Sequence, residues 1–238
     1  MTIYLTELSN DKSYFPSLDS ALKDPDGLLA IGGDLSPERI VSAYRQGIFP
    51  WFSDGDPILW WSPSKRAVIQ PTDCHISKSM KRLIRKNTFT VTVNHAFSDV
   101  IDACAQPRKS QAETWICAAM ITAYNKLHQL GYAHSIEVWK EEQLVGGLYG
   151  MSIGKFFCGE SMFSIENNSS KIAFIALNQH LSQFENTYID CQMQTSHLSS
   201  LGVKEITREK FIQHLHSAKE QSLTEHCWTP QNIVLTTL

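Results

Sequence analysis

The chain has 238 residues, 42% of them hydrophobic, which is enough for one large or two modest domains with a packed core. Its 21 basic and 24 acidic residues give a net charge of −3, which excludes a nucleic-acid binder that relies on bulk positive charge. No apolar run approaches the ~20 residues of a membrane-spanning helix, and residues 1–12 lack the basic start and apolar block of a signal peptide.

Residues 1–64 carry most of the prolines and several glycine-rich turns. A helix is expected to begin after Ser36, because serine suits the N-cap and Pro37 suits the first helical position. The same helix should stop at Gly47. We therefore predict a small, irregular α/β domain at 1–64, followed by a second domain at 65–238.

A strongly basic helix is expected at 76–86. At 100° per residue, Lys78, Arg82, Arg85 and Lys86 lie along one side of it, and the segment contains no acidic residue. Such a run is often only a solvated helix face. Because nothing acidic balances this one, the pattern favours contact with phosphates.

Beyond this helix, hydrophobic spacing alternates between the periods of strands and helices. Strands are expected at 89–93, 134–139, 144–152, 156–163 and 187–192, and helices at about 96–104, 116–127, 168–184 and 208–219. A polar loop is expected at 106–113. Helices, an antiparallel meander, a helix and a further strand indicate an α+β, GNAT-like (N-acetyltransferase-like) domain with a mixed, largely antiparallel sheet.

Six cysteines are scattered along these elements without any C-x-x-C spacing, and several lie in apolar segments. This argues against a zinc site or a disulfide framework and indicates buried free thiols. A reducing cytoplasm is therefore the expected location. The positions are Cys74, Cys104, Cys117, Cys158, Cys191 and Cys227.

The strongest chemical signal lies on two apolar strands that are joined by one helix. The first strand carries Glu160, and the second carries Asp190 and Gln192. Side chains alternate along a strand, so Asp190 and Gln192 are expected to point to the same side. Buried polar groups are costly unless they are paired or used. A satisfied structural pair and a functional site both remain possible interpretations, and the two acidic strands together favour a site.

Long segments of the chain also resemble leucyl/phenylalanyl-tRNA–protein transferases, roughly over residues 15 to 215. The segments are GLLAIGGDLSPERIVSAYRQGIFPWF (27–52), DPILWWSPSKRAV (56–68), ETWI (113–116), HSIEVW (134–139), GGLYG (146–150), FFCGESMFS (156–164) and YIDCQ (188–192). The resemblance implies a GNAT-like fold. It also implies transfer of Leu, Phe or Met from aminoacyl-tRNA to proteins with N-terminal Lys or Arg, which marks them for degradation.

The resemblance assigns two binding regions for the aminoacyl-tRNA. Trp51 and Trp115 are implied to hold the terminal adenosine, because single-stranded bases stack on aromatic rings. An apolar pocket is implied for the aminoacyl side chain, although a stripe at helical spacing is more often plain core. The pocket residues are Leu148, Met162, Phe174, Leu177, Leu181 and Ile189.

The same resemblance implies that Glu160 and Asp190 bind the cationic N-terminal residue of the acceptor. Gln192 and Asp190 are the expected catalytic residues. Gln192 can accept the amine proton while Asp190 polarises it, or Asp190 can act as the base directly or through water. The aminoacyl ester is already activated, so no metal or other cofactor is expected. We also expect a monomer without membrane contact.

Two alternative functions compete with this interpretation. An acyl-CoA-dependent N-acyltransferase would need a pyrophosphate turn, and the nearest match, Gln143–Leu148, ends in leucine instead of glycine or alanine. A noncatalytic RNA-binding module would use the basic helix alone. It would leave Glu160, Asp190 and Gln192 without a role.

Overall fold

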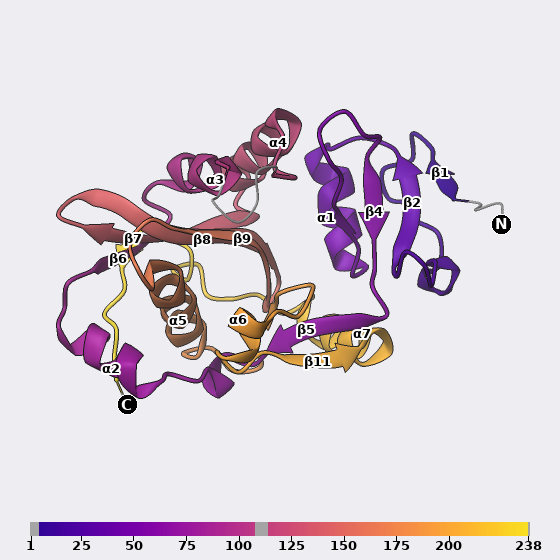
Figure 1. Ribbon diagram of the computed structural model, residues 1–238. Helices are drawn as coiled ribbons and strands as arrows, with labels where there is room; N and C mark the ends of the chain where they lie inside the picture. Colours follow the sequence, from indigo (N-terminus) through magenta and orange to yellow (C-terminus); the bar gives the residue numbers. More distant parts are fainter. Residues whose placement is uncertain (1–4, 108–113, 238) are drawn as a thin grey trace.

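The computed structural model describes residues 5–107 and 114–237, which form two β-sheets with helices packed around them (Figure 1). The smaller sheet is ordered β1 (Thr6–Leu8), β2 (Leu28–Gly32), β4 (Leu59–Trp61) and β3 (Phe49–Pro50). Strand β1 pairs with β2 in parallel, and the other pairs are antiparallel. Residues 6–61 thus complete one sheet before the chain enters the other. The predicted domain boundary at 64 and 65 stays a prediction.

Helix α1 (Pro37–Arg45) packs against this smaller sheet and begins where the sequence predicts. The N-cap chemistry differs from the expectation, because the Ser36 side chain makes no capping hydrogen bond. The Ser36 backbone N–H is instead bound by Asp34 Oδ1 at 2.8 Å. The helix stops before Gly47, whose φ of +79° is the left-handed conformation that glycine adopts most readily.

The larger sheet is mixed. Its order is β11 (Lys204–Thr207), β5 (Lys65–Ile69), β10 (Tyr188–Asp190), β9 (Phe156–Ser164), β8 (Gln143–Ile153), β7 (Ala133–Lys140), β6 (Thr90–Val93) and β12 (Gln231–Asn232). Strands β7, β8 and β9 form the predicted antiparallel meander. Strand β10 lies parallel to β9, because helix α5 (Ser169–Leu181) carries the chain back between them.

Helices cover both faces of the larger sheet (Figure 1). Helices α3 (Phe97–Ala105) and α4 (Ala118–Gln129) lie on one face, and α5 and α2 (Lys78–Arg85) lie on the other. Short helices η1 (Leu18–Ser20), η2 (Pro71–Asp73) and α6 (Ser196–Ser199) occupy connections. The mixed α/β architecture and most element positions match the expectation. The predicted polar loop lies outside the described residues from position 108 onward. Within the described ranges, no helix is long and apolar enough to cross a membrane.

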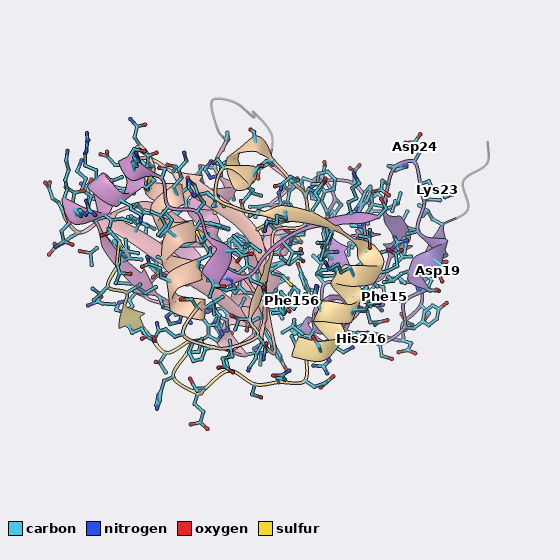
Figure 2. All side chains as sticks on the ribbon, turned by 90° about the horizontal axis from the view of Figure 1, so that it is seen from below. Phe15, Asp19, Lys23, Asp24, Phe156 and His216 are labelled. Atoms are coloured by element: carbon cyan, nitrogen blue, oxygen red, sulfur yellow. The ribbon has the colours of Figure 1, made fainter. Side chains whose placement is uncertain are left out.

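Helix α7 (Arg208–Ala218) lies between the larger sheet and the N-terminal part of the chain. Figure 2 shows this helix, which carries His216, between Phe156 of β9 and Phe15. On one side its Phe211 ring meets Phe156 edge to face at 5.5 Å. On the other side, Phe211 lies directly against Gly47. The helix therefore helps to fix the two sheets against each other.

A buried ion pair joins the same parts. The Arg66 side chain on β5 donates from Nε and Nη2 to Asp190 on β10, with its shortest contact at 2.7 Å. Its Nη1 donates to the Gly47 carbonyl at 2.8 Å, and its guanidinium lies over the rings of Phe49 and Phe211. Both charged side chains are essentially unexposed. One guanidinium thus binds a central strand, the end of α1 and helix α7.

This geometry predicts that Asp190→Asn destabilises the protein. The substitution leaves the Arg66 charge buried without a counter-charge, and breaking a buried pair costs about 3–5 kcal/mol. Urea unfolding measures the loss. Lys65→Ala, which removes an exposed ion pair with Glu205, is the control and should change stability by less than about 1 kcal/mol. Equal effects from both variants would contradict a structural role for the buried pair.

Candidate active site

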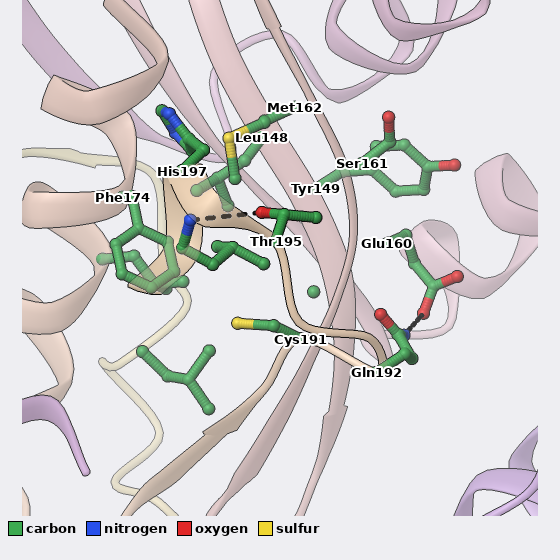
Figure 3. A pocket seen from close by; sticks show the side chains of 14 residues that line it. Leu148, Tyr149, Glu160, Ser161, Met162, Phe174, Cys191, Gln192, Thr195 and His197 are labelled. Carbon is green, nitrogen blue, oxygen red and sulfur yellow. Dashed lines mark hydrogen bonds between the residues drawn. The ribbon is translucent and has the colours of Figure 1, made fainter. Parts of the chain in front are cut away.

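An apolar cavity of about 290 Å³ opens between α5, strands β8 and β9, and the segment after β10 (Figure 3). The structure places five of the six predicted pocket residues in its wall. These are Leu148, Met162, Phe174, Leu177 and Ile189. Leu181 does not line the cavity, because it lies one turn further along α5, where it is 1% exposed and packed in the core. The helical stripe is therefore divided between cavity and core.

The remaining wall residues were not predicted to belong to the apolar pocket. They are Tyr149, Gly159, Glu160, Ser161, Cys191, Gln192, Thr195, His197 and Leu198, of which Glu160 and Gln192 were predicted for other roles. Thr195 and Leu198 share one local signal, since the Thr195 hydroxyl caps α6 by accepting the Leu198 backbone N–H at 3.2 Å. The threonine N-cap thus indicates the start of α6, and the cavity position of its residues is seen only in the structure.

Strand β9 presents Glu160 to the cavity in a half-buried position. Its Oε1 accepts the Tyr44 hydroxyl at 2.6 Å and the Gln192 amide Nε2 at 3.2 Å, while its Oε2 accepts the Tyr124 hydroxyl at 3.0 Å. Burial raises the pKa of Glu160 to about 7, although the two tyrosine hydrogen bonds act in the opposite direction. This carboxylate can therefore take up or release a proton near neutral pH.

Strand β10 ends at Asp190, two residues earlier than predicted, because Gln192 adopts a φ of +54°. This left-handed conformation is uncommon outside glycine. The Gln192 backbone N–H is held by Asp190 Oδ1 at 2.9 Å, and its side-chain Nε2 is held by Glu160. Figure 3 shows the amide oxygen turned away from Glu160, toward the cavity. The bend thus delivers a hydrogen-bond acceptor to the site.

The expectation that Asp190 contacts the acceptor must be corrected. Asp190 is 0% exposed, does not line the cavity, and gives both oxygens to Arg66 and the Gln192 backbone. Strand alternation explains this, because Ile189 and Cys191 face the cavity and Asp190 faces the opposite side. Asp190 and Gln192 therefore do not share a face. Cys191 does face away from Asp190, but it lies in the cavity wall, where burial raises the pKa of its thiol.

Two tyrosines complete the polar side of the site. Tyr44 comes from α1 and Tyr124 from α4, and their hydroxyl oxygens lie 2.7 Å apart. Burial, followed by the nearby Glu160 charge, raises the pKa of both hydroxyls well above the usual value, so both stay protonated. Tyr124 falls within the helix expected at about 116–127, and the sequence pattern offered no sign of its partner. A buried tyrosine hydroxyl needing a partner was the available clue.

A second cleft, of about 560 Å³, contains both predicted adenosine-binding residues. Trp51, Trp115 and Trp61 line it together with Asp54 and Asp56. Trp51 is 37% exposed and meets Trp61 edge to face at 5.5 Å. The Trp61 indole donates to the Trp51 carbonyl at 2.7 Å, which fixes the backbone beneath the exposed ring.

The basic side chains of α2 are presented to solvent. Lys78, Arg82, Arg85 and Lys86 are all exposed, whereas Met80 and Ile84 of the same helix face the core. Across residues 5–107 and 114–237, no acidic side chain forms an ion pair with these four cations. The sequence pattern therefore predicts the exposed basic face correctly, and its ligand stays a prediction.

Gly146 and Gly147, the nearest match to a pyrophosphate turn, lie inside strand β8. A Cβ at Gly146 would meet Ser169 Oγ at 2.3 Å, and one at Gly147 would meet the Ile136 carbonyl at 2.8 Å. Both glycines thus permit close packing of α5 and β7 against β8. This use of the two glycines weakens the acyl-CoA interpretation.

A largely apolar cavity with a few convergent polar groups, one of them a carboxylate with a shifted pKa, is the kind of site that enzymes build. Two family profiles match this chain. The first, "Leucyl/phenylalanyl-tRNA protein transferase", covers residues 68–216, and the second, the N-terminal domain of the same family, covers residues 33–64.

Close relatives agree with these profiles, and each carries the name leucyl/phenylalanyl-tRNA–protein transferase. Proteins from Psychromonas ingrahamii and Tolumonas auensis are 60% and 53% identical to this chain; each match covers 99% of the chain and at least 99% of the relative. The Aeromonas hydrophila protein is 48% identical over 99% of the chain and 100% of the relative. The chain therefore belongs to the leucyl/phenylalanyl-tRNA protein transferase family.

Among solved structures, L-PGS from Bacillus licheniformis is similar with a TM-score of 0.40 and 14% identity, covering 71% of this chain and 54% of that one.

The raised pKa of Glu160 predicts a specific dependence of stability on pH. Between its usual pKa of 4.5 and about 7, the folded protein binds the Glu160 proton more tightly than the unfolded chain. The resulting stabilisation is complete below pH 4.5 and is lost as pH rises through 7. Wild type should therefore lose stability relative to Glu160→Gln between pH 5 and 8, as measured by thermal melting.

Glu166→Gln is the control for this measurement, because Glu166 is an exposed carboxylate paired with Lys140. Its stability difference from wild type should not fall in the same pH window. A constant difference between wild type and Glu160→Gln across pH 5–8 would contradict the raised pKa.

Proposed function

We propose that this protein transfers Leu, Phe or Met from aminoacyl-tRNA to the α-amino group of proteins with N-terminal Lys or Arg. The observation that carries the proposal is the meeting of an apolar cavity with Glu160 and Gln192 at one edge. Such a site can bind an apolar side chain in the cavity while the polar groups at its edge form hydrogen bonds with an amine. Family membership supports the same reaction.

The donor occupies two regions in this proposal. The aminoacyl side chain enters the cavity, where Met162, Phe174 and Leu177 offer apolar contacts suited to unbranched or aromatic groups. The terminal adenine stacks in the cleft of Trp51 and Trp115, where each stacked base contributes about 1–3 kcal/mol. The aminoacyl ester then lies between these regions.

The acceptor's N-terminal residue binds at Glu160, which is the cavity carboxylate left available once Asp190 is paired with Arg66. The Gln192 amide oxygen accepts a hydrogen bond from the α-amine and orients its lone pair toward the ester carbon. Asp190 acts as a positioning residue, because it fixes the Gln192 backbone through Oδ1.

Other features fit the same function. The exposed cations of α2 contact tRNA phosphates, and the larger sheet with its helices corresponds to a GNAT-like fold. The protein works as a monomer in the cytoplasm and marks its substrates for degradation. All six cysteines are free thiols, as expected in a reducing compartment.

A transfer assay tests the proposal directly. The protein is mixed with [14C]Leu-tRNA and a peptide that begins with Arg, and labelled peptide is the expected product. The same peptide with an acetylated N-terminus is the control and should stay unlabelled. Labelling from [14C]acetyl-CoA, but not from Leu-tRNA, would instead establish the acyl-CoA-dependent alternative.

Shortening a side chain in the cavity wall should change the preference of the protein for one aminoacyl-tRNA donor over another. Leu177→Ala removes three carbon atoms from the wall and should raise the kcat/KM ratio of Phe-tRNA to Leu-tRNA by about 5–150-fold, because even one methylene group of difference in an apolar pocket changes discrimination by roughly 1–3 kcal/mol. The measurement compares kcat/KM for the two donors. Leu181→Ala is the matched control, since Leu181 lies on the same helix but in the core. Similar selectivity changes in both variants would argue against a specific wall.

The basic helix predicts a salt-dependent tRNA affinity. Each phosphate contact contributes about −0.7 to −0.9 to the slope of log K against log salt concentration. The double variant Arg82→Ala, Arg85→Ala should therefore flatten the slope by roughly 1–2 units in filter-binding titrations. Lys204→Ala is the control, because Lys204 is already paired with Asp73. An unchanged slope in the double variant would leave α2 as a solvated face.

A further inference from the structure

Glu160, Tyr44 and Tyr124 form a closed triangle of oxygen contacts. The Tyr44 hydroxyl lies 2.6 Å from Glu160 Oε1, the Tyr124 hydroxyl lies 3.0 Å from Oε2, and the two hydroxyls are 2.7 Å apart. All three separations are hydrogen-bond distances, and each such contact needs one hydrogen. We call this set the tyrosine–carboxylate ring.

Counting hydrogens shows that the ring is incomplete when Glu160 is ionised. Two tyrosine hydroxyls supply only two hydrogens, and an ionised carboxylate supplies none, so one of the three contacts has no hydrogen. A proton on Glu160 Oε2 completes the ring, because Oε2 then donates to Tyr124, Tyr124 to Tyr44, and Tyr44 to Oε1. Gln192 Nε2 also donates a hydrogen bond to Oε1, so Oε1 is the oxygen that stays without a proton. The geometry therefore has a place for one additional proton.

We propose that the tyrosine–carboxylate ring is the proton acceptor of the reaction, and that Glu160 takes its proton from the attacking α-amine of the acceptor. This inference rests on the proposed function and specifies which nitrogen group of the acceptor meets Glu160, namely the neutral α-amine and not the cationic side chain. The cavity-lining position supports the choice, since Glu160 lies beside Gln192, where the ester and the α-amine must come together.

The step is balanced without any further reactant. The amine nitrogen bonds to the ester carbonyl carbon, and one amine proton passes to Glu160. The bond between that carbon and the ribose oxygen breaks, and the oxygen leaves with the proton from the ring. Glu160 returns to its ionised form, so each cycle moves one proton from the amine to the ribose hydroxyl.

The groups around Glu160 suit a carboxylate that changes charge during the cycle. Its pKa of about 7, raised by burial, allows both forms to be populated near neutral pH. The titratable and charged groups that interact electrostatically with Glu160 are Tyr44 of α1, Tyr124 of α4, Tyr149 of β8, Cys158 of β9, Asp190 of β10 and Arg66 of β5. The charges of Asp190 and Arg66 largely offset each other, because they form a close pair.

The test compares Glu160→Gln with wild type on two acceptors, one peptide beginning with Arg and the same peptide beginning with citrulline. Citrulline keeps the shape of Arg but has no side-chain charge. Single-turnover rates at saturating acceptor should fall by about 10²–10⁴-fold for both peptides, because both retain the α-amine. The acidic limb of the wild-type pH–rate profile should disappear in the variant.

A loss that appears only in KM for the Arg peptide, and vanishes with citrulline, would overturn the inference and make Glu160 a side-chain receptor. Tyr44→Phe and Tyr124→Phe provide variants that conserve shape. Each should lower the single-turnover rate by about tenfold with little change in peptide KM, since each removes a hydroxyl that makes two of the three contacts of the ring. Wild-type rates in both tyrosine variants would also overturn it.

Glu166→Gln, an exposed carboxylate variant away from the cavity, should transfer at the wild-type rate. Binding of an aminoacyl-adenosine analogue to Glu160→Gln should match wild type, which excludes a folding defect. If wild type itself produces no labelled peptide, the proposed function fails. If wild type labels the peptide and Glu160→Gln does so equally fast, only the present inference fails.

Discussion

The ion pair of Arg66 and Asp190 is the contact on which the rest of the site depends. A buried guanidinium is tolerated only when its charge and its N–H groups are matched. Asp190 supplies the charge, the Gly47 carbonyl accepts a further hydrogen bond, and Phe211 offers an aromatic face. Asp190 can then hold the Gln192 backbone in its unusual conformation. The ion pair of Arg66 and Asp190 therefore sets the position of the Gln192 amide, although neither residue lines the cavity.

A continuous polar path connects this pair with the cavity. It passes from Arg66 through Asp190 and Gln192 to Glu160, and from there to Tyr44 and Tyr124. The path begins on β5, crosses β10 and β9, and ends on α1 and α4. Because Tyr44 lies on α1, which packs against the smaller sheet, the polar side of the site needs both sheets in place. The apolar side depends mainly on α5 and its neighbouring strands.

The sequence predicted the local features of this protein much better than its long-range contacts. The period of the hydrophobic residues predicted the antiparallel meander and α5. The apolar surroundings of Glu160 and Gln192 marked these two residues as site candidates, and the structure brings them together. Arg66 and Asp190 are 124 positions apart, so no local pattern could reveal that Asp190 was already paired. The positive φ of Gln192 ended the strand early and broke the expected alternation. Hydrophobic periodicity correctly predicted that Leu181 is buried. It could not show where along α5 the cavity wall ends and the core begins.

The apolar residues of α5 and the polar residues of the site come from different elements, and this separation has a consequence for protein engineering. Helix α5 supplies Phe174 and Leu177 to the wall, whereas Glu160, Gln192 and the two tyrosines come from other elements. Side chains on α5 can therefore be varied in a combinatorial library while the groups that handle the amine keep their places. Such a library could accommodate unnatural amino acids carrying a fluorophore or a reactive handle, and so attach them to the N-terminus of a chosen protein.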